Sequence, residues 1–211
     1  MNNKINFYLA RHGETEWNLQ RRIQGQLDSG LTQAGQQQAL KLAAHCADLN
    51  LTQILTSPLG RAVDTANICA QYLQLPVKQV AGFEERHFGD WQGKLVSEMK
   101  SNPNYVEVTS QITDCQPNQG ESAKQLLTRF QNTLIKQLEA SNDELNLIIS
   151  HGDILRCFMA KWFAPDLQSQ VHVASTTASP VIPAKSTGYD YQNAQLIALS
   201  YDIKTGTFST L

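Results

Sequence analysis

Residues that could perform phosphate chemistry stand at the end of the first apolar segment. The motif Arg11-His12-Gly13-Glu14-Thr15 follows directly after residues 5–10, in which Ile, Phe and Leu alternate with Asn, Tyr and Ala. This alternation is typical of a β-strand. An arginine offers a planar set of N–H donors that matches phosphate oxygens, and a neutral imidazole can attack phosphorus. The motif therefore predicts a phosphate site with His12 as the nucleophile and Arg11 beside it.

Other polar residues follow other predicted strands. They are Arg61 after the strand at 53–56, Glu84 and Glu85 after the strand at 76–80, and His151 after the apolar run at 145–149. Ligands of open α/β sheets bind at the carboxyl ends of the strands. Because these three strands and the strand before His12 would deliver such residues to one edge of a sheet, we expect the residues to meet in a single site.

Phosphoryl transfer is the reaction that this set of side chains favours, since it depends chiefly on positioning and on electrostatic stabilisation of the phosphoryl oxygens. Arg11 and Arg61 would bind those oxygens, and the backbone at Gly152, near a helix start, would add N–H donors. Like-charge repulsion by the arginines would hold one histidine neutral, while His151 would stabilise charge on the phosphoryl group. A carboxylic acid with a raised pKa would give the leaving alcohol its proton.

The remaining sequence predicts the elements that position these residues. Helices are expected from Thr32 to about Asn50, from Ser57-Pro58 onward, from Ser122 onward and after Asp153, and a last strand at 194–201. Strands that alternate with helices predict an α/β fold, a three-layer sandwich around a mostly parallel sheet. We expect a single domain over residues 1–211.

Two stretches follow neither period. Residues 94–118, interrupted by Pro103 and Pro117, predict short helices and loop, and we expect about 94–142 to form a helical insertion over the site. Residues 166–185, rich in Ser and Thr, predict a long loop to which the sequence assigns no role.

The composition limits the classes of partner and compartment. The 211 residues carry a formal net charge of −2, which offers no basic surface for nucleic acid. No apolar run reaches the roughly 20 residues needed to cross a bilayer, and the first residues lack the apolar segment of a secretory signal. Four scattered cysteines predict buried, reduced thiols and thus a cytoplasmic location. The sequence predicts no oligomeric state.

Six motifs, in this order, resemble those of the histidine phosphatase superfamily, also called phosphoglycerate mutase-like. They are 11–15 with Trp17-Asn18, Gln24-Gly25 with Leu31-Thr32, 57–62 with Thr65-Ala66, Glu85 with Phe88-Gly89, 120–122, and Ser150-His151-Gly152. Together they span roughly residues 5 to 160, which is most of the chain. The resemblance implies a six-stranded, mostly parallel sheet flanked by helices.

The same resemblance implies roles for individual residues. His12 would be the phosphorylated nucleophile, Arg11, Arg61 and His151 would complete the phosphate pocket, Glu85 would be the general acid, and Asn18, Gln24, Gly25 and the Gly152 backbone would contact substrate or phosphate. From the residues alone, Glu84, Asp90 and Glu14 compete with Glu85 for the acid role. The phosphatase branch implies neither a metal nor a coenzyme.

Several alternatives stay open. The interval from Glu85 to Gly120 is shorter than cofactor-dependent mutases devote to covering their substrate, which favours a metal-independent phosphomonoesterase for a small phosphorylated metabolite. The α-ribazole phosphatases are one candidate group, and a phosphoglycerate mutase-type transferase or a non-catalytic phosphate-binding domain are the other readings. A zinc site made of His12, His151 and Glu85 is disfavoured, because short ligand spacing is lacking and two arginines oppose a cation.

Overall fold

A six-stranded sheet forms the centre of the computed structural model, which describes residues 3–141, 145–163 and 192–211. The strands β1 to β6 are Lys4–Arg11, Gln53–Thr56, Val77–Gln79, Asn146–Ser150, Leu196–Asp202 and Thr207–Thr210. Their spatial order is β3-β2-β4-β1-β5-β6. The first four strands pair in parallel, β5 is antiparallel to β1, and β6 is antiparallel to β5. The predicted mostly parallel sheet is confirmed.

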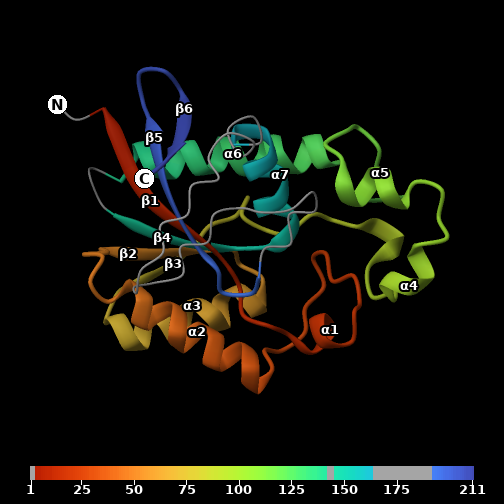
Figure 1. Cartoon of the computed structure of the whole chain (residues 1–211), viewed down its shortest axis with the longest axis horizontal. Coiled ribbons are helices and arrows are strands. Elements are labelled where there is room, and N and C mark those ends of the chain that lie inside the picture. Colours follow the sequence, from red (N-terminus) through yellow and green to blue (C-terminus); the bar gives the residue numbers. More distant parts are fainter. Residues whose placement is uncertain (1–2, 142–144, 164–191) are drawn as a thin grey trace, which may run out of the picture.

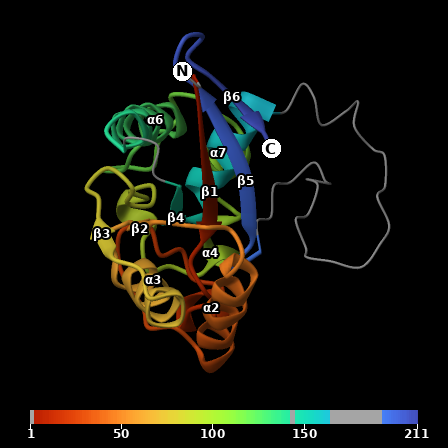
Figure 2. The ribbon, with the colours of Figure 1, turned by 90° about the vertical axis from the view of Figure 1, so that its left-hand side faces the viewer.

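Four long helices cover the two faces of this sheet, as Figures 1 and 2 show. In Figure 1, α2 (Gln33–Cys46) and α3 (Gly60–Leu73) lie below the sheet, and α6 (Ala123–Glu139) and α7 (Gly152–Phe163) lie above it. Side-chain caps fix two of their starts, because Thr32 accepts from the backbone of α2 and Ser122 forms a capping box with Gln125 at α6. The predicted three-layer α/β sandwich is thus confirmed.

Each face of the sheet buries its own apolar cluster. Successive strand residues point to opposite faces, so Phe7 and Leu9 pack with the α6–α7 layer, whereas Ala10 packs with the α2–α3 layer. All five residues of β4 are buried. The apolar run that predicted this strand therefore reflects its place between two helical layers.

A smaller helical part lies beyond the carboxyl ends of the parallel strands. It comprises η1 (Gly89–Trp91), α4 (Val96–Met99) and α5 (Tyr105–Ser110), on the same side of Figure 1 as α1 (Glu16–Leu19). Phe88, Trp91 and Val108 form a separate apolar cluster inside it. These short elements match the expectation for residues 94–118.

The expected insertion at about 94–142 extends too far along the chain. Helix α6 buries Phe130, Leu134 and Leu138 in the same cluster as the β1 side chains, so it belongs to a covering layer of the sheet. The part outside the layers accordingly ends before Ala123.

Other boundaries differ from the sequence expectations for local reasons. Helix α3 begins at Gly60 instead of Ser57-Pro58, because the Ser57 N–H donates to the Ile149 carbonyl and prolongs the pairing of β2 with β4. Strand β6 was not expected from the sequence, and only one of its four residues is buried. The long loop predicted for 166–185 lies outside the described residues.

The cysteines and the helices bear on the remaining expectations. All four cysteines are free, and Cys46, Cys69 and Cys157 are buried, as predicted. Burial raises the pKa of the Cys46 and Cys69 thiols to about 12, so they stay protonated and inert. Among the described residues, no helix has the length and apolar character to span a membrane.

Candidate active site

A cavity of about 260 Å³ opens at the carboxyl ends of the parallel strands. All but one of the residues that the sequence predicted for the site line this cavity. Those that line it are Arg11, His12, Asn18, Gln24, Gly25, Arg61, Glu85 and Gly152. The exception is His151, which is fully buried beside the cavity, with its ring centroid 5.2 Å from that of His12. The predicted convergence of strand ends on one site is therefore present in the fold.

His12 is held as a neutral imidazole. Its Nδ1 lies 2.7 Å from the Gly13 carbonyl oxygen, which can only accept, so Nδ1 carries the hydrogen. Its Nε2 accepts from the Arg61 Nε–H at 3.2 Å. Burial, followed by the charges of Arg61 and Arg11, lowers the pKa of His12 well below its ordinary value. The free lone pair of the His12 ring is thus on Nε2. Burial lowers the pKa of His12 more than the like-charge repulsion that the sequence suggested.

Backbone packing fixes the position of His12. Its N–H donates to the Ser150 carbonyl at 3.0 Å, and its own carbonyl accepts from Asn193 Nδ2 at 2.9 Å. The next residue, Gly13, lies so close to the start of α2 that an added Cβ would be 2.5 Å from the Gly35 carbonyl oxygen. A glycine is needed there, because a side chain would push the loop after β1 away from α2.

Arg61, the second residue of α3, is almost fully used by the protein itself. Its Nη1 donates to the Leu27 carbonyl and to Asp28 Oδ1, both at 2.8 Å, and its Nη2 donates to the Gly25 carbonyl at 2.7 Å. With the Nε–H directed at His12, four of the five N–H donors are engaged within the described part of the chain. One Nη2–H, and Nε–H once it leaves His12, can therefore serve a phosphate.

Asp28 was missed by the sequence reasoning. Besides binding the Arg61 guanidinium, its carboxylate accepts from the backbone N–H groups of Gly60 and Arg61 at 2.6 and 3.3 Å. It thus caps α3 from a distance, where the residue at the cap position, Leu59, has no side chain able to do so. No local sequence pattern reveals this role, because Asp28 and its partners Gly60 and Arg61 lie far apart in the sequence.

Arg11 packs against the first turn of α7. An added Cβ at Gly152 would lie 3.2 Å from both Cζ and Nε of Arg11. The absence of a side chain at Gly152 therefore lets the guanidinium approach the positive end of the helix, where both favour an anion.

His151 is the most enclosed member of the group. Its Nε2 lies 2.7 Å from Ser57 Oγ, while its Nδ1 has no hydrogen-bond partner among the described residues. Burial, followed by the charge of Arg61, lowers the pKa of His151 well below its ordinary value. It is therefore neutral and can present one N–H to a neighbouring anion.

Glu85 lines the same cavity as His12 and is a buried carboxyl group. Its two oxygens accept from the backbone N–H groups of Arg86, at 2.9 Å, and Asp153, at 3.1 Å. Burial and the nearby charge of Asp153 raise the pKa of Glu85, although the two N–H donors oppose this shift. Of the carboxylates weighed from the sequence, only Glu85 lines the cavity, whereas Glu84 pairs with Arg129 and Glu14 accepts from Thr32.

Comparison with known proteins agrees with this geometry. The family model described as "Histidine phosphatase superfamily (branch 1)" matches residues 7–189. The chain belongs to the histidine phosphatase superfamily. It is 31% identical over 205 residues to the probable phosphoglycerate mutase GpmB of Escherichia fergusonii, covering 95% of this chain and 92% of that protein. It is also 35% identical over 164 residues to the uncharacterized phosphatase PhoE of Bacillus subtilis, covering 76% and 80%.

Two solved structures superpose on nearly the whole chain. YhfR of Bacillus stearothermophilus superposes with a TM-score of 0.77 at 28% identity, covering 98% of this chain and 95% of that one. A mycobacterial glucosyl-3-phosphoglycerate phosphatase superposes with a TM-score of 0.77 at 26% identity, covering 98% and 97%.

Three residues for which family membership implies substrate contact also hold the loop together in this superfamily member. Asn18 uses its Oδ1 to accept from the Thr15 backbone, so only its Nδ2 remains to face a ligand. Gln24 donates to Thr15 Oγ1 and accepts from Ser29. Gly25 adopts a φ of +58°, and its carbonyl accepts from Arg61. The hydrogen bonds of these three residues hold the loop that lines the cavity.

Further residues that line the cavity were not singled out from the sequence. They are Arg22, Ile23, Phe88, Thr109, Asp153 and Arg156. Arg22 is fixed by its Nη1 bond to the Gly93 carbonyl at 2.9 Å, and Arg156 by its bond to Asp153 at 2.5 Å. Arg156 lies one helical turn beyond Gly152 on α7, a spacing that could have been read from the sequence once the helix start was known. In the described segments, no group of three or more His, Cys, Asp or Glu side chains is placed to hold a metal ion.

Proposed function

We propose that this chain is a metal-independent phosphomonoesterase that forms a phosphohistidine on His12. One observation carries the proposal: a neutral imidazole with its lone pair on Nε2 shares a cavity with a carboxyl group, Glu85, whose pKa is raised. The pair supplies a nucleophile and a proton donor without a metal ion.

The first half-reaction transfers the phosphoryl group to the protein. His12 Nε2 forms the bond to phosphorus while the bond from phosphorus to the leaving oxygen breaks, and Glu85 gives its proton to that oxygen. Arg11 and Arg61 stabilise the negative charge of the phosphoryl oxygens. The hydrogen bond from His12 Nδ1 to the Gly13 carbonyl supports the positive charge that the ring acquires.

The second half-reaction returns the enzyme to its starting state. Glu85, now a carboxylate, takes a proton from water as the water oxygen attacks phosphorus. The bond from phosphorus to Nε2 breaks, inorganic phosphate leaves, and both His12 and Glu85 are neutral again. The same carboxyl group therefore serves as acid and then as base.

The cavity suits a small anionic metabolite. Its volume of about 260 Å³ lies just below the usual range for ligand pockets, which begins at about 300 Å³. Four arginines line it, namely Arg11, Arg22, Arg61 and Arg156, against the carboxyl groups of Glu85 and Asp153. A dianionic phosphate ester would balance this positive surplus. We extend the proposal to a cytoplasmic enzyme that acts without a nucleic-acid or membrane partner, in keeping with the charge and composition of the chain.

A mutase is the second candidate, because relatives named phosphoglycerate mutase match nearly the full chain. In a mutase, the phosphohistidine would return its phosphoryl group to the substrate before water could attack. The limited size of the helical part formed by η1, α4 and α5 favours water access and hence hydrolysis. Turnover of 3-phosphoglycerate with and without 2,3-bisphosphoglycerate separates the two activities.

Trapping the intermediate tests the phosphatase proposal. Wild-type protein quenched during turnover of p-nitrophenyl phosphate should carry acid-labile, base-stable phosphate that peptide mapping places on His12. His12→Ala should carry none and should lose activity, while EDTA should leave the wild-type rate unchanged. A fully active His12→Ala protein would overturn the proposal, and loss of activity in EDTA would favour a metal mechanism.

A further inference from the structure

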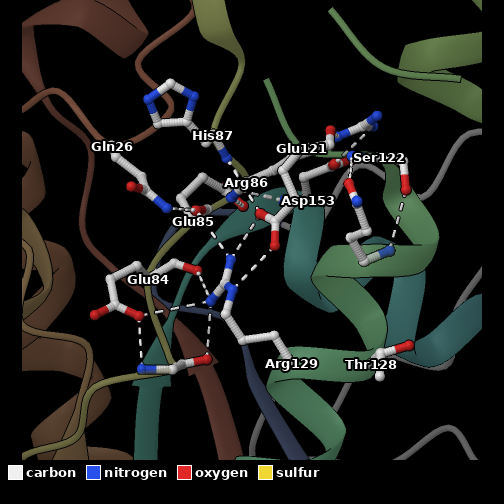
Figure 3. A network of polar contacts seen from close by, with 12 residues as sticks. Gln26, Glu84, Glu85, Arg86, His87, Glu121, Ser122, Thr128, Arg129 and Asp153 are labelled. Atoms are coloured by element: carbon white, nitrogen blue, oxygen red, sulfur yellow. Dashed lines mark hydrogen bonds and ion pairs between the residues drawn. The ribbon is translucent and has the colours of Figure 1, made fainter. Parts of the chain in front are cut away.

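Arg129 on α6 uses its whole guanidinium to hold the segment that carries Glu85, although Arg129 does not line the cavity (Figure 3). Its Nη1 donates to the Gly82 and Glu84 carbonyls, both at 2.9 Å, and its Nη2 donates to the Glu85 carbonyl at 3.4 Å. Nε and Nη2 also donate to the two carboxylate oxygens of Glu121, at 3.0 and 2.8 Å. All five N–H donors are thereby used.

Glu121 gives this guanidinium a fixed orientation. Two parallel bonds from one carboxylate set both the place and the plane of the guanidinium. Glu121 is itself fixed, because its N–H donates to the His87 carbonyl at 2.7 Å and its carbonyl accepts from Arg86 Nε at 2.7 Å. The side chains of Glu121 and Arg129 are only 15% and 27% exposed, so solvent weakens the pair less than it would at the surface.

The segment that receives these bonds has no regular structure of its own. Residues 83–88 belong to no helix or strand. Gln26 Nε2 also donates to the Glu85 carbonyl, at 3.0 Å. Because ladder or helical hydrogen bonds do not fix this backbone, side chains that bind its carbonyls help to set its position.

We propose that Arg129, oriented by Glu121, is a positioning residue for the general acid Glu85. The inference rests on the proposed function, because it assigns Glu85 the task of protonating the leaving oxygen. A general acid works only within hydrogen-bond reach of the atom it protonates, and a displacement of about 1 Å can cost about 100-fold in rate. Arg129 donates to the backbone of Glu85, and none of its hydrogen bonds in the described part of the chain goes to Arg61 or His12.

A pair of esters separates this role from a general loss of structure. An alkyl phosphate such as glycerol 3-phosphate or 3-phosphoglycerate releases a basic alkoxide that needs a proton, whereas p-nitrophenyl phosphate releases a stable phenolate that does not. For Arg129→Met, we expect kcat/KM on the better alkyl ester to fall by ~10–100-fold and kcat/KM on the aryl ester to stay within ~3-fold. Arg129→Lys, with three donors in place of five, should restore the alkyl activity only in part.

Matched variants complete the experiment. Lys124 lies on the same helix as Arg129 and forms an exposed ion pair with Asp114, so Lys124→Met should leave kcat/KM unchanged on both esters. Glu85→Gln should show the same leaving-group dependence as Arg129→Met, with a larger fall. Glu121→Gln removes the anchor of the guanidinium while keeping its size, so it should reproduce the pattern more weakly even if Arg129→Met fails to fold.

Each result decides the inference. Equal losses on both esters in Arg129→Met and Glu121→Gln, or no loss on the alkyl ester, would overturn the positioning role. So would a wild-type enzyme that hydrolyses only the aryl ester, because no general acid would then be at work. Failure of the wild-type protein to hydrolyse either ester would instead refute the proposed function. Thermal unfolding midpoints of the variants identify any that are merely unfolded.

Discussion

In the proposed site, we call His12, His151 and Arg61 the nucleophile end, and Glu85 with its surrounding segment the acid end. Burial shifts the pKa values of the titratable groups at the two ends in opposite directions. At the nucleophile end, burial and neighbouring arginines lower the pKa of His12 and His151, so both rings are neutral. At the acid end, burial and the charge of Asp153 raise the pKa of Glu85, so its carboxyl group retains a proton more readily. Burial disfavours the charged form in each case. One physical cause thus yields a free lone pair at one end and an available proton at the other.

The two ends also differ in what holds them. His12 follows β1 and Arg61 lies in the first turn of α3, so regular elements place the nucleophile end. Glu85 lies in a segment without regular structure, whose carbonyls are bound by Arg129 and Gln26. Arg61 keeps an N–H for a ligand, whereas Arg129 keeps none. The first arginine can still donate to a ligand, whereas the second holds backbone carbonyls.

Replacing Arg61 should produce the largest effect and should not depend on the leaving group. Losing one charge-assisted donor to the transition state costs about 2.7–4 kcal/mol, so Arg61→Gln should slow phosphoenzyme formation by roughly 10²–10³-fold. Single-turnover kinetics with an alkyl and an aryl phosphate measure this step. An effect confined to the alkyl ester would show that the two ends are not separate.

Gly152→Ala tests the nucleophile end more gently. The new Cβ would lie 3.2 Å from Cζ and Nε of Arg11, so the guanidinium must shift from the start of α7. We expect inorganic phosphate to inhibit the variant ~10–30-fold less strongly, since a positioned charge-assisted bond would weaken. Stability should hold, because alanine is the better helix former.

Gly30→Ala serves as its control. An added Cβ at Gly30 meets no atom within 4 Å, so inhibition by phosphate should be unchanged. Equal inhibition of Gly152→Ala and wild type would mean that Arg11 does not depend on this close approach.

The nucleophile end was the more predictable of the two from the sequence. Apolar runs located β1, β2 and β4 to within one residue at each end, because buried parallel strands are nearly all apolar. His12 and His151 each follow such a run directly, so locating the strand located the residue. β6, with a single buried residue, carries too weak a pattern to be read.

The contacts that support Glu85 and Arg61 could not be read in this way. Arg129 lies far from Glu85 in the sequence, and its partners are mostly carbonyl oxygens, which every residue possesses. The extent of the helical insertion was misjudged for a related reason: the apolar stripe of α6 indicates that the helix is buried but not against which layer. Asp28 likewise binds residues that lie far from it in the sequence.

The pH dependence of stability should show the opposite behaviour of the two ends, and it is the smallest effect we expect. The pKa of His12 and His151 in the folded protein lies below the ordinary value of 6.5, so below that pH the unfolded chain binds more protons than the folded one. Their contribution is complete above 6.5 and is lost as the pH falls. Glu85 acts in reverse, because its raised pKa favours the folded state less as the pH rises above the ordinary value of 4.5.

Between pH 4.5 and 6.5, the two histidines stabilise the folded protein less as the pH falls, whereas Glu85 stabilises it more. Each histidine contributes up to about 1.4 kcal/mol per pH unit, and because there are two, the free energy of unfolding should fall toward acid pH. Urea unfolding across this window measures the slope, and His151→Gln should make it shallower. A flat or inverted slope in the wild-type protein would mean that the histidines are not held neutral, and the lone pair assigned to His12 Nε2 would then be occupied by a proton over part of the working range.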